Sequence, residues 1–473
     1  MKIRPAAGMV LAWSVLAGAL GAQIGGEPTG SSALGAGRAG AGGAAADSVL
    51  DAQRNPASLS FLFDGGNARK AQSGALHLEA RGFAQTFTGR SRGGERFRDD
   101  SKPAGGPWLG WATRIDEDLV AALTLSPTFA GAIDMRRQTR LNVGTPTRSR
   151  EIAHDNGFLQ VALQPGIAWR ASPTLALGAG VSLRHTRLSL QSATEVDTRS
   201  TFKGDSGLGQ SWGGLLSGPP FNIAKIQTEY DGDANQDLAA ALHLGLAWQA
   251  SSDLRVALWY RSPSTKGDLE GAVDVNLDPD MGPILKFFNL DGMSRYDFAI
   301  RGISFPQQLG VAMSQRLSER DRAHFDFFWT DWSSTFDGLT AELSNPSNRD
   351  FKTLIGGNGA TDFDLDLRWR DVYALALGLE HDLQRSITVR AGVGWSSDPT
   401  AGSVAPGTHV LNRWHVGTGA SFWNGLGGDW HFALTVALPS GYRNGENAVL
   451  EDFSNDRYRS TIYAVAVAYS LHF

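Results

Sequence analysis

Bulky apolar side chains alternate with small or polar ones along most of this chain, from about residue 73 to the C-terminus. The last segment shows the pattern most clearly, with Tyr463, Val465, Val467, Tyr469, Leu471 and Phe473 on one face and alanine, serine or histidine between them. A segment at residues 175–184 repeats it. Because successive side chains of a strand point to opposite faces, period two predicts strands with one apolar and one wet face.

The connections between the alternating segments are either short or long, and short and long connections alternate strictly along the chain. Short turns are predicted at 116–118, 171–173, 250–253, 318–321, 382–385 and 424–428. Long polar connections occupy roughly 90–104, 134–156, 191–237, 277–296, 344–361, 397–411 and 444–457. Six turns and seven loops join fourteen strands, and the even number and the alternating loop lengths are typical of a bacterial outer-membrane barrel. A soluble sandwich also has alternating strands, but it does not segregate its loop lengths in this way.

Closing such a sheet would let its strands cross a bilayer. In hydrocarbon every backbone polar group must be paired within the protein, and closure removes the unpaired edge. We therefore predict an all-β fold, a fourteen-stranded antiparallel transmembrane β-barrel spanning residues 73–473. Tryptophans near predicted strand ends are expected in the interfacial girdles, namely Trp111, Trp169, Trp248, Trp259, Trp395, Trp414 and Trp430. The terminal Phe473 suits a last strand that is read by the barrel-assembly machinery.

The N-terminus has the three parts of a secretory signal. Lys2 and Arg4 precede an apolar run, and small residues follow it. We predict a signal peptide over residues 1–22, with cleavage before Gln23. An uncleaved anchor helix is the alternative, but the apolar run is shorter than the roughly 20 residues that a span needs. Export and membrane strands together predict the outer membrane of a Gram-negative bacterium, in contact with its lipid and lipopolysaccharide.

The amino-acid composition excludes several other kinds of binding or catalytic site. The formal net charge of −5 implies no basic face for nucleic acid. The absence of cysteine excludes disulfides, zinc–thiolate sites and thiol nucleophiles. We expect no cofactor and no metal.

Three motifs suggest chemistry that their context does not support. Gly35, Gly37 and Gly40 form a GxGxxG, but no strand–helix unit brackets it as a dinucleotide site requires. The GxSxG at residues 209–213 lies in a predicted external loop, whereas a hydrolase nucleophile needs a strand-to-helix turn. The Asp–x–Asp–x–Asn at 231–235 lacks the glycine and glutamate of a calcium-binding EF-hand loop, so we expect a solvated acidic loop base.

Residues 23–72 do not fit the barrel pattern. They are rich in glycine, alanine and serine, show no alternation and precede the first strand. A segment of about fifty small residues would fit inside a barrel. We predict that residues 23–72 form a hatch that plugs the lumen.

Short motifs spread over residues 30–473 carry a family resemblance. In the N-terminal segment they are SSALG at 31–35, Arg38-Ala39, GGAAAD at 42–47 and Arg54-Asn55-Pro56-Ala57. In the barrel they are Tyr260-Arg261-Ser262, TDWS at 330–333 with Phe336, and Arg390-Ala391-Gly392 with Asp398-Pro399. In this order they resemble the outer-membrane long-chain fatty acid and aromatic hydrocarbon transporters of the FadL/TodX family.

The resemblance implies a monomeric barrel for passive transport of hydrophobic compounds. External loops three and four would capture the substrate, which would pass to a site beside the hatch and leave through an opening near strand three. The apolar residues of these loops fit a capture groove, although they also fit a self-packed loop tip: Trp212, Leu215, Leu216, Phe221, Ile223, Ile284, Leu285, Phe287 and Phe288. Pro127 has no N–H for the sheet and marks either the lateral opening or an ordinary break above the membrane.

Two arginines lie at strand positions whose side chains are expected to point into the barrel. Arg184 and Arg390 fall on the small-residue faces of their strands, and a lipid-facing arginine at mid-depth would cost about 2–4 kcal/mol. Each would pair either with a substrate carboxylate or with an acid of the lumen or hatch.

We therefore expect an outer-membrane channel, not an enzyme, that takes up long-chain fatty acids or similar compounds. Monoaromatic hydrocarbons or other apolar solutes are the alternative within the same fold. A lipid hydrolase would need a serine–histidine site on the outer face, and an open porin would lack the hatch. The outward residues are leucine, valine, alanine and aromatics, which argues against the hydrolase, and the predicted hatch and the apolar loops disfavour the porin.

Overall fold

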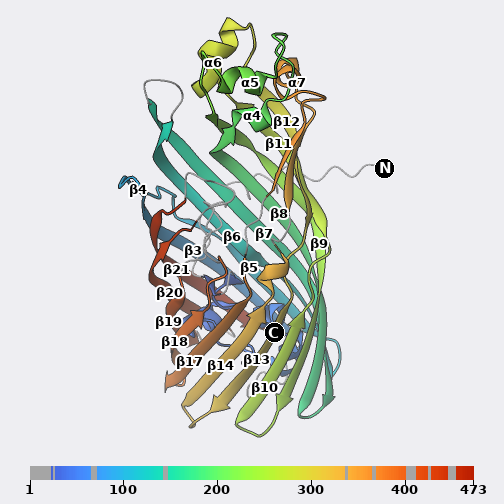
Figure 1. Ribbon diagram of the computed structural model, residues 1–473. Coiled ribbons are helices and arrows are strands. Elements are labelled where there is room, and N and C mark those ends of the chain that lie inside the picture. The colour runs from blue at the N-terminus through green and yellow to red at the C-terminus, as the bar shows by residue number, and fades with distance from the viewer. Residues whose placement is uncertain are drawn as a thin grey trace.

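The computed structural model describes residues 23–24, 27–64, 72–141, 148–335, 339–364, 369–400, 412–423, 428–445 and 454–473. The predicted signal peptide lies outside these residues, as do 65–71 of the predicted hatch and Phe336. Figure 1 shows a tall barrel that carries most of its helices at one end. No helix in the described ranges is long and apolar enough to cross a membrane.

In the described parts of the chain, nineteen strand segments form the barrel wall, and β1 (Gln23–Ile24) and β2 (Glu27–Pro28) form a separate small sheet. The wall segments are β3 (Gly74–Arg90), β4 (Arg96–Arg98), β5 (Ala104–Arg114), β6 (Leu119–Leu141), β7 (Arg148–Ser172), β8 (Leu175–Asp197), β9 (Lys225–Gln249), β10 (Leu254–Arg261), β11 (Gly267–Asn276), β12 (Met293–Ile303), β13 (Gln308–Arg316), β14 (Asp321–Thr330), β15 (Thr340–Ser344), β16 (Thr361–Asp364), β17 (Val372–Gln384), β18 (Ile387–Ser396), β19 (Trp414–Trp423), β20 (Gly428–Arg443) and β21 (Arg457–His472). Five barrel strands are each interrupted and consist of two segments, so the nineteen described segments make fourteen barrel strands. The antiparallel pairing of β21 with β3 closes the ring.

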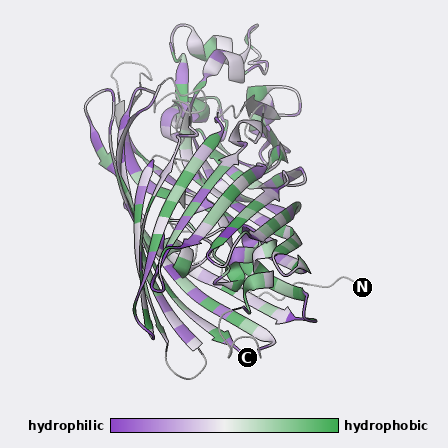
Figure 2. Ribbon diagram, turned by 90° about the horizontal axis from the view of Figure 1, so that it is seen from below, coloured by the Kyte–Doolittle hydropathy of each residue, from purple (hydrophilic) through white to green (hydrophobic). Residues whose placement is uncertain are grey.

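The predicted fold class is therefore confirmed, and so is the alternation that led to it. Leu177 and Val181 of β8 are exposed on the lipid side, as are Tyr463 and Val465 of β21. Figure 2 shows apolar and polar segments following each other along the wall strands.

One predicted girdle residue faces the other way. Trp111, Trp169, Trp248, Trp414 and Trp430 are exposed, as the girdle requires, and Trp395 is partly exposed. Trp259 is buried and points inward, where its Nε1 donates to Gln308 Oε1 at 3.2 Å. The expectation for Trp259 was wrong because its neighbour Leu258 takes the lipid-facing position. Gly310 on β13 leaves the space that the indole ring fills.

Two predicted loops are in large part strand. Strands β6 and β7 pair from Leu119 out to Leu141, well past the predicted start of the loop at 134. Likewise β8 reaches Asp197 and β9 begins at Lys225, so Asp231 and Asp233 lie on a strand and not at a loop base. In the upper part of β6 the exposed positions carry polar residues such as Arg136 and Gln138, so the apolar face that marks a membrane strand disappears.

Short helices occupy two places. Helices α4 (Thr198–Thr201), α5 (Trp212–Ser217), α6 (Asp278–Phe287) and α7 (Arg349–Ile355) belong to the long connections, and η3 (Trp332–Ser334) follows β14. Helices α2 (Ala33–Gly37), η1 (Val49–Gln53) and η2 (Pro56–Phe61) belong to residues 27–64, which we call the N-terminal segment. Most of this segment is buried.

Candidate functional site

The N-terminal segment is shaped by side-chain caps at each of its short helices. Ser32 caps α2, and Ser48 forms a capping box with Asp51 at η1. Asn55 caps η2 by accepting from the backbone N–H of Ala57 at 3.1 Å, with Pro56 at the first helical position. Such caps satisfy the free N–H groups of a helix start. A segment of small residues can therefore hold a defined path.

Arg38 binds both to other residues of the N-terminal segment and to the barrel wall. Its Nη1 lies 2.6 Å from Asp47 Oδ2 and 2.9 Å from Glu380 Oε1 on β17, and Nε donates to Ala41 O at 2.9 Å. The side chain is fully buried. Burial alone would lower the pKa of Arg38, but the two carboxylates raise it above its ordinary value. The charge is therefore retained.

A second tie joins the segment to β14. Arg54 Nη1 donates to Asp326 Oδ2 at 2.8 Å, and Asp326 also accepts from the backbone N–H groups of Gly42 and Gly43. The Arg54 guanidinium lies over the inward-facing Trp259 ring, 5.7 Å from its centroid. Gly43 has no space for a side chain because Trp259 and Ala312 are adjacent.

The Asn55-Pro56-Ala57 turn sits directly on the wall. Gly245 of β9 faces Asn55 Oδ1, and Gly178 of β8 faces the backbone of Pro56 and Ala57 so closely that a methyl group at either position would overlap them. Asn55 Nδ2 also donates to Leu246 O at 3.2 Å. These contacts fix the turn against two neighbouring strands.

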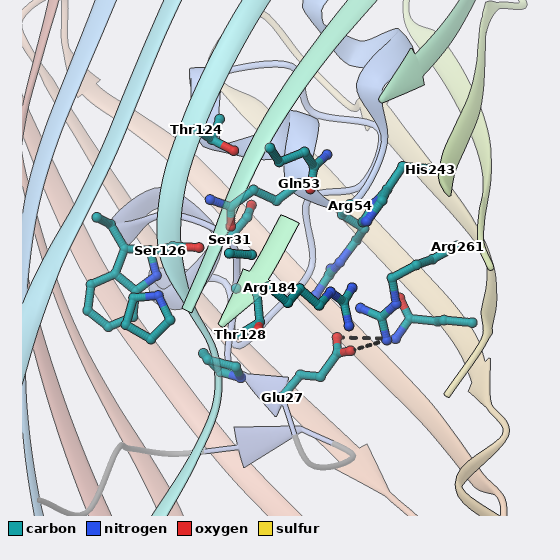
Figure 3. A pocket seen from close by; sticks show the side chains of 17 residues that line it. Glu27, Ser31, Gln53, Arg54, Thr124, Ser126, Thr128, Arg184, His243 and Arg261 are labelled. Atoms are coloured by element: carbon teal, nitrogen blue, oxygen red, sulfur yellow. Dashed lines mark hydrogen bonds and ion pairs between the residues drawn. The ribbon is translucent and has the colours of Figure 1, made fainter. Parts of the chain in front are cut away.

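Beside the segment lies a polar cavity of about 60 Å³, lined in part by Glu27, Arg54 and Gln53 of the segment. Its wall side includes Arg184, His243 and Arg261, and Figure 3 shows these groups around one space. Glu27 forms an ion pair with Arg261 and accepts from Gln308 Nε2 at 3.2 Å. Burial alone would raise the pKa of Glu27, but the Arg261 guanidinium holds it below its ordinary value.

Arg184 differs from Arg54, Arg261 and Arg390, each of which has an ion-paired carboxylate. It is 2% exposed, and its Nε donates to Ser182 Oγ at 3.0 Å. Among the residues that the structure describes, no carboxylate lies within ion-pair distance of it. Arg390 also faces inward, but it is paired with Glu380. The two candidate lumen residues are therefore not equivalent.

The wall changes its pairing beside the same cavity. The ladder between β5 and β6 ends at Leu109–Leu125, and β5 above that point pairs with β3 alone. On that side, within the described residues, β6 has no ladder partner until the bridge from Asp99 to Met135. Pro127 lies at the start of this stretch, next to an irregularity in the β6–β7 register, and lines the cavity.

The candidate capture residues come together in an apolar cluster that also includes wall residues such as Phe129 and Phe298. Trp212, Leu215, Leu216, Ile223 and Leu285 are buried in one apolar cluster, against which Phe221, Ile284 and Phe288 pack. The Phe288 ring lies 5.0 Å from that of Trp212, centroid to centroid. Phe287 is 78% exposed. The two loops thus form one packed unit with a single phenylalanine left outside.

The remaining motifs form no reactive site in the described structure. Ser211 of the GxSxG caps the six-residue helix α5, with its Oγ accepting from Gly214 N. No group of three or more metal-binding side chains occurs in the described ranges.

Glu380 and Asp326, which hold Arg38 and Arg54, were not predicted from the sequence. A signal was present, because an acid within a membrane-spanning strand must face the lumen. Each was therefore a candidate partner for an arginine of the N-terminal segment.

The family described as outer membrane protein transport protein (OMPP1/FadL/TodX) matches residues 8–448. A long-chain fatty acid transport protein from Escherichia coli O6:H1 (strain CFT073) is 25% identical over 157 residues, which are 33% of this chain and 32% of that relative. The match thus spans about a third of the relative's length.

Solved structures with a similar fold include two toluene transporters. The P. putida toluene transporter TodX has a TM-score of 0.70 at 15% identity, covering 94% of this chain and 99% of its own. The Ralstonia pickettii toluene transporter TbuX has a TM-score of 0.68 at 16% identity, with 94% and 99% covered. A Pseudomonas aeruginosa FadL homologue has a TM-score of 0.67 at 14% identity, with 96% and 99% covered.

Proposed function

This chain belongs to the OMPP1/FadL/TodX family of outer-membrane transport proteins, and from that premise we propose that its substrates are hydrophobic carboxylates such as long-chain fatty acids. The family transports hydrophobic compounds across the outer membrane of Gram-negative bacteria and is not a family of enzymes. The proposal concerns which compound this chain carries and by which path.

The observation that carries the proposal is that Arg184 has no carboxylate paired with it directly, although Glu27 acts on its charge from beyond ion-pair distance. In the cavity Glu27 is committed to Arg261, whereas Arg184 has only a serine hydroxyl as its partner among the described residues. A buried cation without a counterion is costly, so an anionic group is favoured beside it. A carboxylate supplies that charge, whereas a monoaromatic hydrocarbon leaves the guanidinium unpaired.

We propose that the N-terminal segment moves during transport, and the small size of the cavity supports this. A volume of about 60 Å³ holds a few water molecules, because each needs roughly 10–15 Å³ of such space. A fatty acid is far larger, so residues 27–64 must shift to admit it. We propose that these residues are the core of a hatch over residues 23–72, held closed by the Arg38 and Arg54 ion pairs.

The path begins at loops three and four and ends in the wall. The exposed Phe287 offers the first apolar contact, and the packed cluster beneath it supplies a surface for an acyl chain. The exit that we propose is the unpaired stretch of β6 above Leu125, since it adjoins the cavity through Pro127. Transport along this path is passive.

The test compares oleate with its uncharged methyl ester. Arg184→Gln should weaken oleate binding by roughly ten- to a hundredfold, because a hydrogen bond to a charged group contributes about 1.5–3 kcal/mol. The methyl ester should bind the variant and the parent protein alike. Arg320→Gln, at an exposed turn, is the matched control. Retention of toluene without retention of oleate would favour the monoaromatic alternative.

A further inference from the structure

Six arginines gather on the outer wall of the barrel, away from the transport path. Arg90, Arg96, Arg98, Arg136, Arg457 and Arg459 line an open hollow of about 710 Å³ at the long-loop end. On β21, Arg457 and Arg459 share the parity of the exposed Tyr463 and Val465 below them. The arginines of this strand therefore stand on the lipid-facing side of the wall.

The strand register aligns three of these arginines in one row. Arg457 on β21 is the partner of Arg90 on β3, and Arg90 is the partner of Arg96 on β4. We call Arg457, Arg90 and Arg96 the arginine row. Like charges directly opposite each other destabilise a sheet. The arrangement is therefore unfavourable unless an anion lies over the row.

The acidic residues nearby do not neutralise the arginine row. Arg98 pairs with Asp100 at 2.9 Å, and Arg136 lies 3.4 Å from Glu151. Across the described parts of the chain, no carboxylate lies within 4 Å of the guanidinium groups of the row. The hollow thus presents a net positive charge to whatever adjoins the wall.

The height of the hollow matches the outer membrane–water interface. The aromatic girdle at the opposite end includes Tyr469, whose ring lies 5.0 Å from that of Trp430, centroid to centroid. Ten residues separate Tyr469 from Arg459. At about 3.4 Å per residue and a tilt of about 40°, this is roughly 26 Å, close to the ~25 Å height of a barrel's apolar band. The arginines therefore stand where the headgroups of the outer leaflet begin.

We propose that the arginine row binds the phosphorylated sugar headgroup of an outer-leaflet glycolipid, lipopolysaccharide in particular. Guanidinium groups match phosphate oxygens in bidentate geometry. Below the row, the exposed Tyr463 and Val465 provide an apolar surface along which the acyl chains of the same molecule lie. Free phosphate would use the arginines alone, whereas a glycolipid uses both features.

The test measures binding of bis-phosphorylated rough lipopolysaccharide to the detergent-purified full-length protein. The variant Arg90→Gln/Arg96→Gln/Arg457→Gln should lose at least tenfold in affinity. The control Arg316→Gln/Arg320→Gln/Arg385→Gln removes the same charge from the exposed turns at the other end and should stay within twofold of the parent protein. Heat-modifiable migration in gels verifies that each barrel is folded.

Two further measurements identify which part of the lipid the arginine row binds. Dephosphorylated lipopolysaccharide should bind the parent protein no better than the intact lipid binds the arginine-row variant. Millimolar inorganic phosphate should not displace the intact lipid. Equal binding of lipopolysaccharide by the parent and the arginine-row variant would overturn the proposal, and displacement by inorganic phosphate would reduce the hollow to a small-anion site.

Discussion

Arg54 and Asp326 join the N-terminal segment to the barrel wall through a hydrogen-bonded ion pair 2.8 Å long. Asp326 is fully buried and also accepts from two backbone N–H groups of the segment. One carboxylate thus fixes three points of a segment that has few large side chains of its own. Removing one partner of such a buried pair costs about 3–5 kcal/mol, since the other charge is left uncompensated.

We expect Asp326→Asn to loosen the segment and to make the barrel leak. The amide keeps the shape of the carboxylate but removes its charge, so Arg54 loses its counterion. Single-channel conductance in planar bilayers should show openings to polar solutes that are rare in the parent protein. Asp253→Asn, at an exposed turn, is the control. Identical conductance of Asp326→Asn and the parent protein would contradict the proposed role of the pair.

Glycines of the wall should be as important as the charges. A methyl group at Gly245 would overlap Asn55 Oδ1, so Gly245→Ala should push the Asn55-Pro56-Ala57 turn away from β9. We expect faster hydrogen exchange in η2 and increased leak. Gly82→Ala is the matched control, because a methyl group there meets nothing within 4 Å. If both variants behave alike, the close contact at Gly245 is not what holds the turn.

The barrel was predictable because lipid imposes one rule on every strand that crosses it. Leu177 and Val465 are exposed on the outer face as the alternation requires. The rule ends where the bilayer ends, which is why the upper parts of β6 and β7 were taken for loop. Trp259 was misplaced because residue type alone does not distinguish a girdle tryptophan from an inward one.

The site was less predictable than the barrel because it depends on pairings between distant residues. The inward parity of Arg184 and Arg390 followed from the sequence, but which arginine has an acid beside it did not. Arg390 is paired with Glu380, ten residues earlier, and Glu27 reaches Arg261 across the lumen. The Glu27–Arg261 pairing depends on how the N-terminal segment is threaded, and no periodicity records that. Glu380 and Arg390, by contrast, are cross-strand partners on β17 and β18, joined by the turn predicted at 382–385.

Acidification from pH 7 to 5 should tighten the N-terminal segment through Asp51. Burial, and then the neighbouring Asp47 carboxylate, raise the pKa of Asp51 to about 6. The folded state then binds a proton that the unfolded state releases above about pH 4, so stability increases as the pH falls through 6. Between pH 7 and pH 5 the gain is on the order of 1 kcal/mol, and it approaches about 3 kcal/mol only as the pH falls below about 4. Glu27 affects stability in the opposite direction, because its pKa is lowered in the folded state. Its contribution to stability is fully present above pH 4.5 and is lost only at lower pH.

Hydrogen-exchange protection of η1 at pH 5 and pH 7 measures this effect after correction for intrinsic rates. Asp51→Asn should remove the pH dependence while it keeps an oxygen that can accept from Ser31 Oγ, now at 2.8 Å. Protection that falls on acidification in the parent protein would show that another group governs the segment.

Substrate capture should depend on Phe287 more than on its neighbour. Phe287 is 78% exposed, whereas Phe288 packs against Trp212 and Phe221. Phe287→Ser therefore removes an exposed apolar contact without opening the cluster, and it should reduce uptake of radiolabelled oleate at low concentration but not at saturation. Phe288→Ser should also lower the stability of the loops, by less than the roughly 3–5 kcal/mol of a fully buried aromatic ring, because Phe288 is partly buried. Proteolysis of the external loops separates the two effects. Normal uptake by Phe287→Ser would mean that capture does not begin at this tip.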